Sequence, residues 1–128
     1  MADNLAPSAR GVVLLDFDGT LYPWRPIMSE PDPLPGAAEA VRRLYDAGLR
    51  IVIFTSRLSP KWLAEAGYNA DNQLEHIERL LKRDGIPYHE ITAEKQAAEF
   101  YVDDRAIRFR EGEWPAIADW ILYTRDAA

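Results

Sequence analysis

Hydrophobic and polar positions follow two alternating patterns along this 128-residue chain. Short unbroken apolar runs, of which Val12–Leu15 and Ile51–Phe54 are the clearest, are typical of strands buried in a parallel sheet. Between such runs, apolar residues recur every three or four positions, as on one face of a helix. This alternation predicts an α/β fold: a single Rossmann-like domain, residues 11–128, with a mainly parallel sheet and helices on both faces.

The expected elements can be placed by these patterns and by the glycines that bound them. Strands are predicted at 12–16, 50–55, 88–92, 100–102 and 106–110. Helices are predicted from Gly36 to a stop at Gly48, at 71–83, at 95–99 and at 114–123. Residues 1–10 are expected to form a flexible N-terminal tail. Trp114 and Trp120 are expected in the core, and His76 on the exposed side of its helix.

Two long connections interrupt the pattern. Residues 20–35 hold five of the nine prolines, which predicts a stiff, irregular surface loop. Residues 56–70 are expected to form a loop or a broken helix. Trp24 and Trp62, one in each connection, are expected to pack these loops down rather than to bind ligand.

The first strand ends in two carboxylates one residue apart, Asp16 and Asp18. Side chains alternate along a strand, so both leave the same side of it. Like charges at short range repel strongly in a partly dry site, and a divalent cation is the natural counter-charge. A lone Asp-x-Asp-Gly is more often a turn than a site, so the interpretation depends on what accompanies it.

Polar residues also follow two further predicted strands. Parallel strands bring their carboxyl ends to one edge of the sheet, where ligands bind in such folds. That edge is predicted to gather the following side chains: Asp16, Asp18, Thr55, Ser56, Asp103 and Asp104. Carboxylates, hydroxyls and a lysine suit phosphoryl transfer with Mg²⁺, since that ion prefers hard oxygen ligands. One carboxylate can attack phosphorus while its neighbour moves the proton.

These residues resemble the signatures of the haloacid dehalogenase-like hydrolase superfamily. The segment 16–21 (Asp-Phe-Asp-Gly-Thr-Leu) is similar to its first signature and 51–57 to its second. Lys95 is similar to its third, and 101–105 (Tyr-Val-Asp-Asp-Arg) to its fourth. The resemblance covers residues 11 to about 110. An acidic residue at position 18 favours the phosphatases of this superfamily over its dehalogenases.

The resemblance implies a role for each matching residue. Asp16 would be the nucleophile and Asp18 the general acid/base. Mg²⁺ would be held by Asp16, by the backbone carbonyl of Asp18, by Asp103 and by Asp104, the last directly or through water. Thr55 and Lys95 would contact the phosphoryl group. Ser56 and Arg57 join the substrate-binding set for a different reason, because they follow the second predicted strand at the same edge of the sheet. The expected function is a magnesium-dependent phosphatase that hydrolyses a phosphate monoester through an aspartyl-phosphate on Asp16.

Spacing further indicates a member of this superfamily without a cap domain. Only 34 residues separate Thr20 from Thr55, and a loop and one helix use them up. An open cleft favours a large phosphorylated substrate, or closure by the loops 21–35 and 57–70, or by a second subunit in a homodimer. Two alternatives stay open: a phosphotransferase with the same site, and a non-catalytic binding or regulatory module.

Composition excludes several other classes. No apolar stretch is long enough to cross a membrane, and residues 1–10 lack the features of a signal peptide, which favours a cytoplasmic protein. Cysteine is absent, so disulfides and thiolate sites are excluded. A net charge of −6 argues against sequence-independent nucleic-acid binding. Nucleic acid is therefore expected only as a substrate that carries a terminal phosphate.

Overall fold

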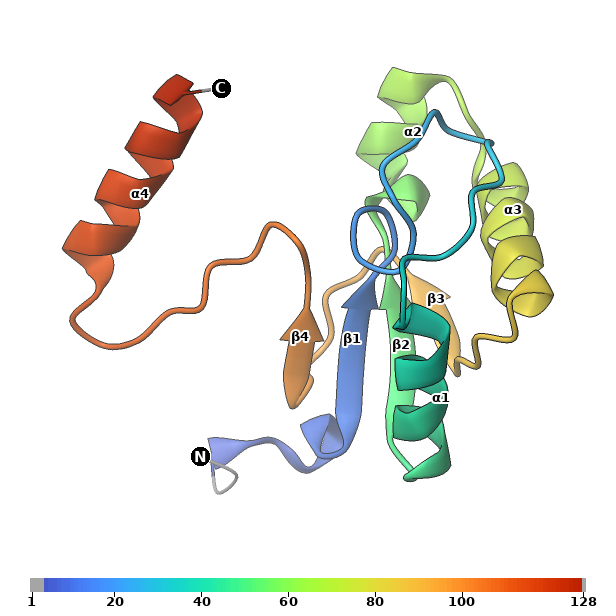
Figure 1. Cartoon of the computed structure of the whole chain (residues 1–128), viewed down its shortest axis with the longest axis horizontal. Coiled ribbons are helices and arrows are strands. Elements are labelled where there is room, and N and C mark those ends of the chain that lie inside the picture. Colours follow the sequence, from blue (N-terminus) through green and yellow to red (C-terminus); the bar gives the residue numbers. More distant parts are fainter. Residues whose placement is uncertain (1–3, 128) are drawn as a thin grey trace.

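A computed structural model describes residues 4–127, which contain a sheet of four parallel strands (Figure 1). The strands are β1 (Val12–Asp16), β2 (Arg50–Phe54), β3 (Glu90–Thr92) and β4 (Phe100–Val102), in the spatial order β3-β2-β1-β4. Register pairs Asp16 with Phe54 on one side of β1 and Leu15 with Val102 on the other. Residues 4–127 therefore form a single α/β domain with a parallel sheet, as the sequence predicts, and contain no cap domain.

Four helices and two short 3-10 turns connect or follow the strands within the described residues. The helices are α1 (Ala37–Asp46), α2 (Pro60–Ala66), α3 (Ala70–Arg83) and α4 (Trp114–Ala127), and the turns are η2 (Pro7–Ala9) and η3 (Ser56–Leu58). Asn69 caps the start of α3, because its side chain accepts the backbone N–H of Asn72 at 2.8 Å. None of the helices in residues 4–127 is both long and apolar enough to span a bilayer.

The main core lies on one face of the sheet. Apolar side chains that alternate along β1 and β2 meet Val41 of α1 and the inner face of α3. The buried strand residues of this core are Val13, Leu15, Ile51 and Ile53. Burying several such side chains, each at about 1.5–3 kcal/mol, is the main stabilising contribution to this half of the domain.

The opposite face of the sheet is covered much less. Its apolar cluster consists of Val12, Leu14, Val52 and Ala98, with Phe54 partly buried against them. Both α1 and α3 pack on the first face, and Figure 1 shows α4 standing apart from the sheet. The structure thus differs from the expected arrangement of helices on both faces. Trp114 and Trp120 of α4, predicted as core residues, are exposed.

Two predicted elements are wrong. Residues 95–98 are irregular rather than helical, because a single turn gains too few hydrogen bonds to offset the cost of nucleating a helix. Residues 106–110 form no strand, since the chain turns away at Asp103–Arg105 and leaves the free edge of β4 without a partner in the described part of the chain.

The proline-rich loop is fastened to α3 by polar contacts. The Nε2 atom of His76 lies 2.9 Å from the carbonyl oxygen of Ser29, and Tyr22 donates its hydroxyl to the carbonyl of Leu80 at 3.1 Å. His76 is therefore buried, which corrects the expectation that it is exposed. The periodicity of the helix misses this burial because a loop, not the sheet, covers that side of α3.

Candidate active site at the carboxyl edge of the sheet

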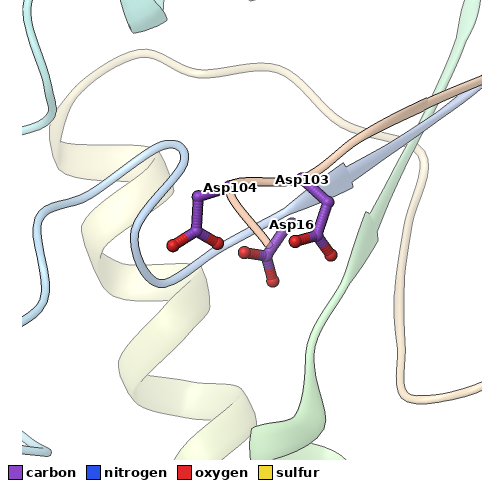
Figure 2. Close-up of side chains that lie close together, drawn as sticks. All are labelled: Asp16, Asp103 and Asp104. Carbon is purple, nitrogen blue, oxygen red and sulfur yellow. The ribbon is translucent and has the colours of Figure 1, made fainter. Parts of the chain in front are cut away.

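Three carboxylates meet where β1 and β4 end. Asp16 is the last residue of β1, and Asp103 and Asp104 follow β4 directly. One oxygen from each lies within 4.8 Å of the others, and Figure 2 shows the three side chains turned toward a common space. The parallel pairing of β1 with β4 produces this arrangement, because it brings the ends of both strands to the same edge.

The negative charges of the three carboxylates repel one another. Burial, followed by a hydrogen bond with Asp104 and the negative charge of Asp103, raises the pKa of Asp16 to about 7. Partial burial opposes ionisation of Asp104, but hydrogen bonds from the Trp24 indole and from Asp16 outweigh it and lower the pKa of Asp104. Hard oxygen donors that repel each other at this separation fit a divalent cation such as Mg²⁺.

Thr20 ties the two strand ends together. Its hydroxyl donates to Oδ2 of Asp16 at 3.1 Å and accepts the backbone N–H of Asp104, also at 3.1 Å. Thr20 is not among the site residues that the sequence predicts. Its position four residues after Asp16, within the same signature, was the available signal.

Trp24 also contacts the site, although its sequence position indicated only loop packing. Its Nε1–H donates to Oδ2 of Asp104 at 3.0 Å, and the guanidinium of Arg105 lies 5.2 Å from the centre of the Trp24 ring. The indole thus orients one carboxylate of the cluster from the outside.

Gly19 makes this close approach possible. Its φ of +85° lies in the left-handed region, which favours glycine. A Cβ atom at this position would overlap Nε1 of Trp24 and the carboxylate of Asp104. The glycine of the Asp-x-Asp-Gly sequence therefore supports the site by leaving room for it.

Asp18 lies beside the cluster but its carboxylate points elsewhere. Its Oδ1 is 3.6 Å from NH1 of Arg57, within a mostly buried ion pair. Burial raises the pKa of Asp18, and the positive charge of Arg57 partly offsets this effect. The predicted contribution of Asp18 to metal binding through its backbone carbonyl stays a prediction.

Arg57 occupies a different position from the one expected of a substrate-binding residue. It is 3% exposed, its Nε donates to Oε1 of Gln73 at 2.8 Å, and its guanidinium lies 5.6 Å from the centre of the Phe17 ring. The turn η3 directs the Arg57 side chain inward, toward Phe17 and Asp18 in the segment that follows β1, rather than outward to solvent. Arg57 therefore faces Asp18 rather than solvent, and its assignment to substrate binding stays a prediction.

Thr55 and Ser56 follow β2 at the same edge. Thr55 is buried, and its Oγ1 accepts the backbone N–H of Arg57 at 3.2 Å, which starts η3. Ser56 borders an open hollow of about 520 Å³ together with Asp16 and Asp103. Contacts of either hydroxyl with a phosphoryl group stay predictions.

Lys95 borders a second hollow of about 660 Å³ that also reaches Asp16 and Asp103. Its Nζ lies 5.1 Å from the centre of the Tyr101 ring on β4. The structure thus brings the predicted lysine to the same side of the sheet as the carboxylates, on an irregular segment rather than at the start of a helix. This hollow, lined by Lys95, Asp16, Leu14, Phe54, Tyr101 and Phe109, is called the back groove below.

Comparison with solved structures supports the fold class. A crystal structure of a protein from Vibrio cholerae is 25% identical, with a TM-score of 0.55, and the match covers 86% of this chain and 98% of that one. A conserved protein from Bacteroides thetaiotaomicron is 21% identical, with a TM-score of 0.53, and the match covers 88% of this chain and 90% of that one. No protein-family model and no curated protein matches the chain. This similarity is one of α/β fold with a parallel sheet, and it assigns no activity.

Proposed function

We propose that this chain is a magnesium-dependent phosphatase of the haloacid dehalogenase-like type, which hydrolyses a phosphate monoester through an aspartyl-phosphate on Asp16. One observation carries the proposal. The carboxylates of Asp16, Asp103 and Asp104, from two different strand ends, converge within 4.8 Å. Such a cluster is unfavourable for stability by itself and suits a cation that phosphoryl transfer needs.

Asp16 is the nucleophile in this proposal. One of its carboxylate oxygens bonds to phosphorus while the bond from phosphorus to the leaving-group oxygen breaks, which yields an acyl phosphate. Asp16, Asp103 and Asp104 would hold the Mg²⁺ ion, which would supply positive charge that keeps Asp16 ionised and offsets the charge of the phosphoryl oxygens. The raised pKa of Asp16 supports this requirement, because the carboxylate alone is only partly ionised near pH 7.

Asp18 moves the proton in both halves of the reaction. It first donates a proton to the departing alcohol or phenol oxygen, and then takes one from the water that attacks the acyl phosphate. The products are the alcohol, inorganic phosphate and free Asp16. Burial raises the pKa of Asp18, as the protonated form of a general acid requires, and the positive charge of Arg57 partly offsets this effect.

The remaining residues at this edge of the sheet fit the binding of a phosphoryl group. Ser56 and Lys95 border the two hollows that reach Asp16, and Thr55 lies between Ser56 and the end of β2. Both hollows are open and no cap covers them, which favours a phosphate at the end of a large molecule over a small enclosed substrate.

Hydrolysis of para-nitrophenyl phosphate in Mg²⁺ tests the proposal. The variant Asp16→Asn is expected to lose about 10³-fold or more in kcat while its circular dichroism is unchanged. Asp32→Asn, an exposed aspartate of the proline-rich loop, serves as the matched control and is expected to retain activity. Full activity in the Asp16 variant would contradict the role of nucleophile.

Product analysis separates the alternatives. A phosphatase releases inorganic phosphate whether or not alcohol acceptors are added, whereas a phosphotransferase shifts the phosphoryl group to the acceptor. A binding module takes up Mg²⁺ but hydrolyses none of a panel of phosphate esters that includes oligonucleotides with terminal phosphates.

A further inference from the structure

Two apolar surfaces of this chain lack a partner in the described structure. The first is the second face of the sheet, where the back groove runs beside Leu14, Phe54 and Tyr101. The second is α4, on which Trp120 is 58% and Tyr123 72% exposed. Parallel sheets are normally covered on both faces, and soluble chains rarely expose apolar patches of more than a few hundred Å². The open sheet face therefore needs an apolar helix to cover it, and α4 needs an apolar surface to pack against.

Helix α4 is apolar around most of its circumference. Its exposed large apolar side chains are Trp114, Trp120, Ile121, Leu122 and Tyr123. Only Asp119, Thr124, Arg125 and Asp126 are polar. A helix that is hydrophobic on all sides needs cover from more than one direction. The single open face of its own sheet would cover one side of α4 and leave the other in water.

The connection between β4 and α4 allows the helix to reach another molecule. It contains 11 residues, 103–113, which span up to roughly 36 Å when extended. Figure 1 shows this segment leading away from the sheet edge, with α4 held apart from β1 and β4. Arms of this kind are typical of chains that exchange a terminal element with a second copy.

We infer that two copies of this chain form a symmetric dimer in which each α4 covers the second sheet face of the other copy, with the two α4 helices side by side. The partner's sheet covers one side of the helix and the partner's α4 covers the other. Because each copy gives the same helix and offers the same face, the arrangement closes at two chains.

The area available is sufficient for a stable dimer. Aromatic side chains bury about 150–250 Å² each. Covering Trp114, Trp120 and Tyr123 on two helices, with the sheet surface opposite them, removes on the order of 1,500 Å² from water, within the roughly 1,200–2,000 Å² of stable specific interfaces. A membrane surface is a poorer occupant, because α4 carries one arginine against two aspartates and the chain has a net charge of −6.

The dimer would also change the candidate site. The back groove is lined both by the carboxylates of Asp16 and Asp103 and by apolar residues of the second sheet face. A helix from the second copy seated on that face forms a wall of the groove close to the carboxylates. The dimer itself is inferred from the apolar surfaces and does not rest on the proposed function.

Light scattering with the full chain tests the inference without any substrate. The wild-type protein is expected to have twice the mass of one chain. Ile121→Glu is expected to weaken the dimer tenfold or more, because it places a charge in the apolar contact. Thr124→Glu adds the same charge at a polar position of the same helix and is the matched control, expected to remain dimeric. Wild-type protein that stays monomeric at all concentrations overturns the inference, as does equal weakening by both variants.

Disulfide trapping then shows whether α4 covers the sheet of its own copy or that of the second copy. The chain has no native cysteine, so only the introduced residues can form a disulfide. Chains with Trp120→Cys alone are mixed with chains with Tyr101→Cys alone and oxidised. A cross-linked pair of the two different chains supports the exchange. Chains that carry both substitutions and form only an internal disulfide, as monomers, show that α4 covers its own sheet and overturn the inference. So does the binding of α4 to anionic vesicles in place of dimer formation.

Discussion

The guanidinium of Arg57 lies 3.6 Å from the carboxylate of Asp18, and both side chains are largely shielded from water. Asp18 comes from the loop after β1 and Arg57 from the turn after β2, so the pair joins two strand ends. Gln73 of α3 holds the Nε of Arg57 at 2.8 Å. This chain of contacts connects the candidate acid/base to the main core of the domain.

Removing the Arg57 charge is therefore expected to destabilise the fold as well as the site. Arg57→Met leaves Asp18 without its counter-charge in a mostly buried position, and breaking such a pair costs about 3–5 kcal/mol. Urea unfolding measures the loss. Arg79→Met, which breaks the exposed pair with Glu30, is the control and is expected to cost less than about 1 kcal/mol. Equal losses in the two variants would show that burial adds nothing to the Arg57 pair.

Magnesium affinity is expected to rise with pH up to about 7. The pKa of Asp16 is raised to about 7, first by burial and then by its acidic neighbours, so below that pH a proton competes with the cation. Titration with Mg²⁺, followed by the fluorescence of Trp24 beside Asp104, checks the trend. Asp16→Asn is expected to bind more weakly and with less pH dependence. Wild-type affinity that is constant between pH 5 and 7 would contradict the prediction.

The raised pKa of Asp16 also affects the folding stability of the metal-free protein, which is expected to fall, not rise, with increasing pH. The folded state keeps a proton on Asp16 that the unfolded chain releases near pH 4, so stability falls as pH rises from about 4 to 7. Added Mg²⁺ is expected to restore this loss at pH 7, because it binds the folded state alone.

Substitution of Gly19 separates backbone strain from crowding. Gly19→Ala and Gly36→Ala both place a side chain at positive φ, which costs about 1–2 kcal/mol. Only Gly19→Ala also pushes on Trp24 and Asp104, since a Cβ at position 36 meets no atom within 4 Å. Gly19→Ala is therefore expected to unfold more easily and to bind Mg²⁺ at least tenfold more weakly. Equal losses of stability and of Mg²⁺ affinity in the two variants would contradict the view that Gly19 leaves room for Trp24 and Asp104.

His76 is expected to make stability pH-dependent. Burial, followed by the positive charge of Arg57, lowers the pKa of its imidazole in the folded state. The unfolded chain takes up the proton near pH 6.5, so the stability present above that pH is lost as pH falls toward the folded-state pKa. The difference in unfolding free energy between the wild type and His76→Gln, measured from pH 8 to 5, isolates this contribution. A difference that does not change with pH would contradict it.

Much of the candidate site follows from local pattern and topology. Apolar runs predict the strands, parallel pairing brings their carboxyl ends to one edge, and Asp16, Asp103 and Asp104 do meet there. The described part of the chain also contains no cap domain, as the spacing of the signatures indicates. The contacts of Thr20 and Trp24 with the carboxylates depend on how the loop after β1 turns back over β4, which no short-range pattern encodes.

Burial of polar and aromatic residues was the weakest part of the prediction. Hydrophobic periodicity reports which side of a helix is apolar, but not what other surfaces reach the remaining sides. His76 is buried by a loop 47 residues away in sequence. Arg57 is buried because the three-residue turn that contains it directs its side chain toward Asp18 and Gln73. Trp120 is exposed because no sheet lies against α4 in the described structure.

The sequence by itself determined the order of the four strands of the sheet and of helices α1, α3 and α4, and the acidic chemistry at the strand ends. Both arise from short-range patterns and from the rule that parallel strands end at one edge. The tertiary structure alone decided which charge pairs with which, what lies in the core and which sheet face stays open. Those outcomes depend on contacts between segments far apart in the chain, where packing and desolvation outweigh local preference.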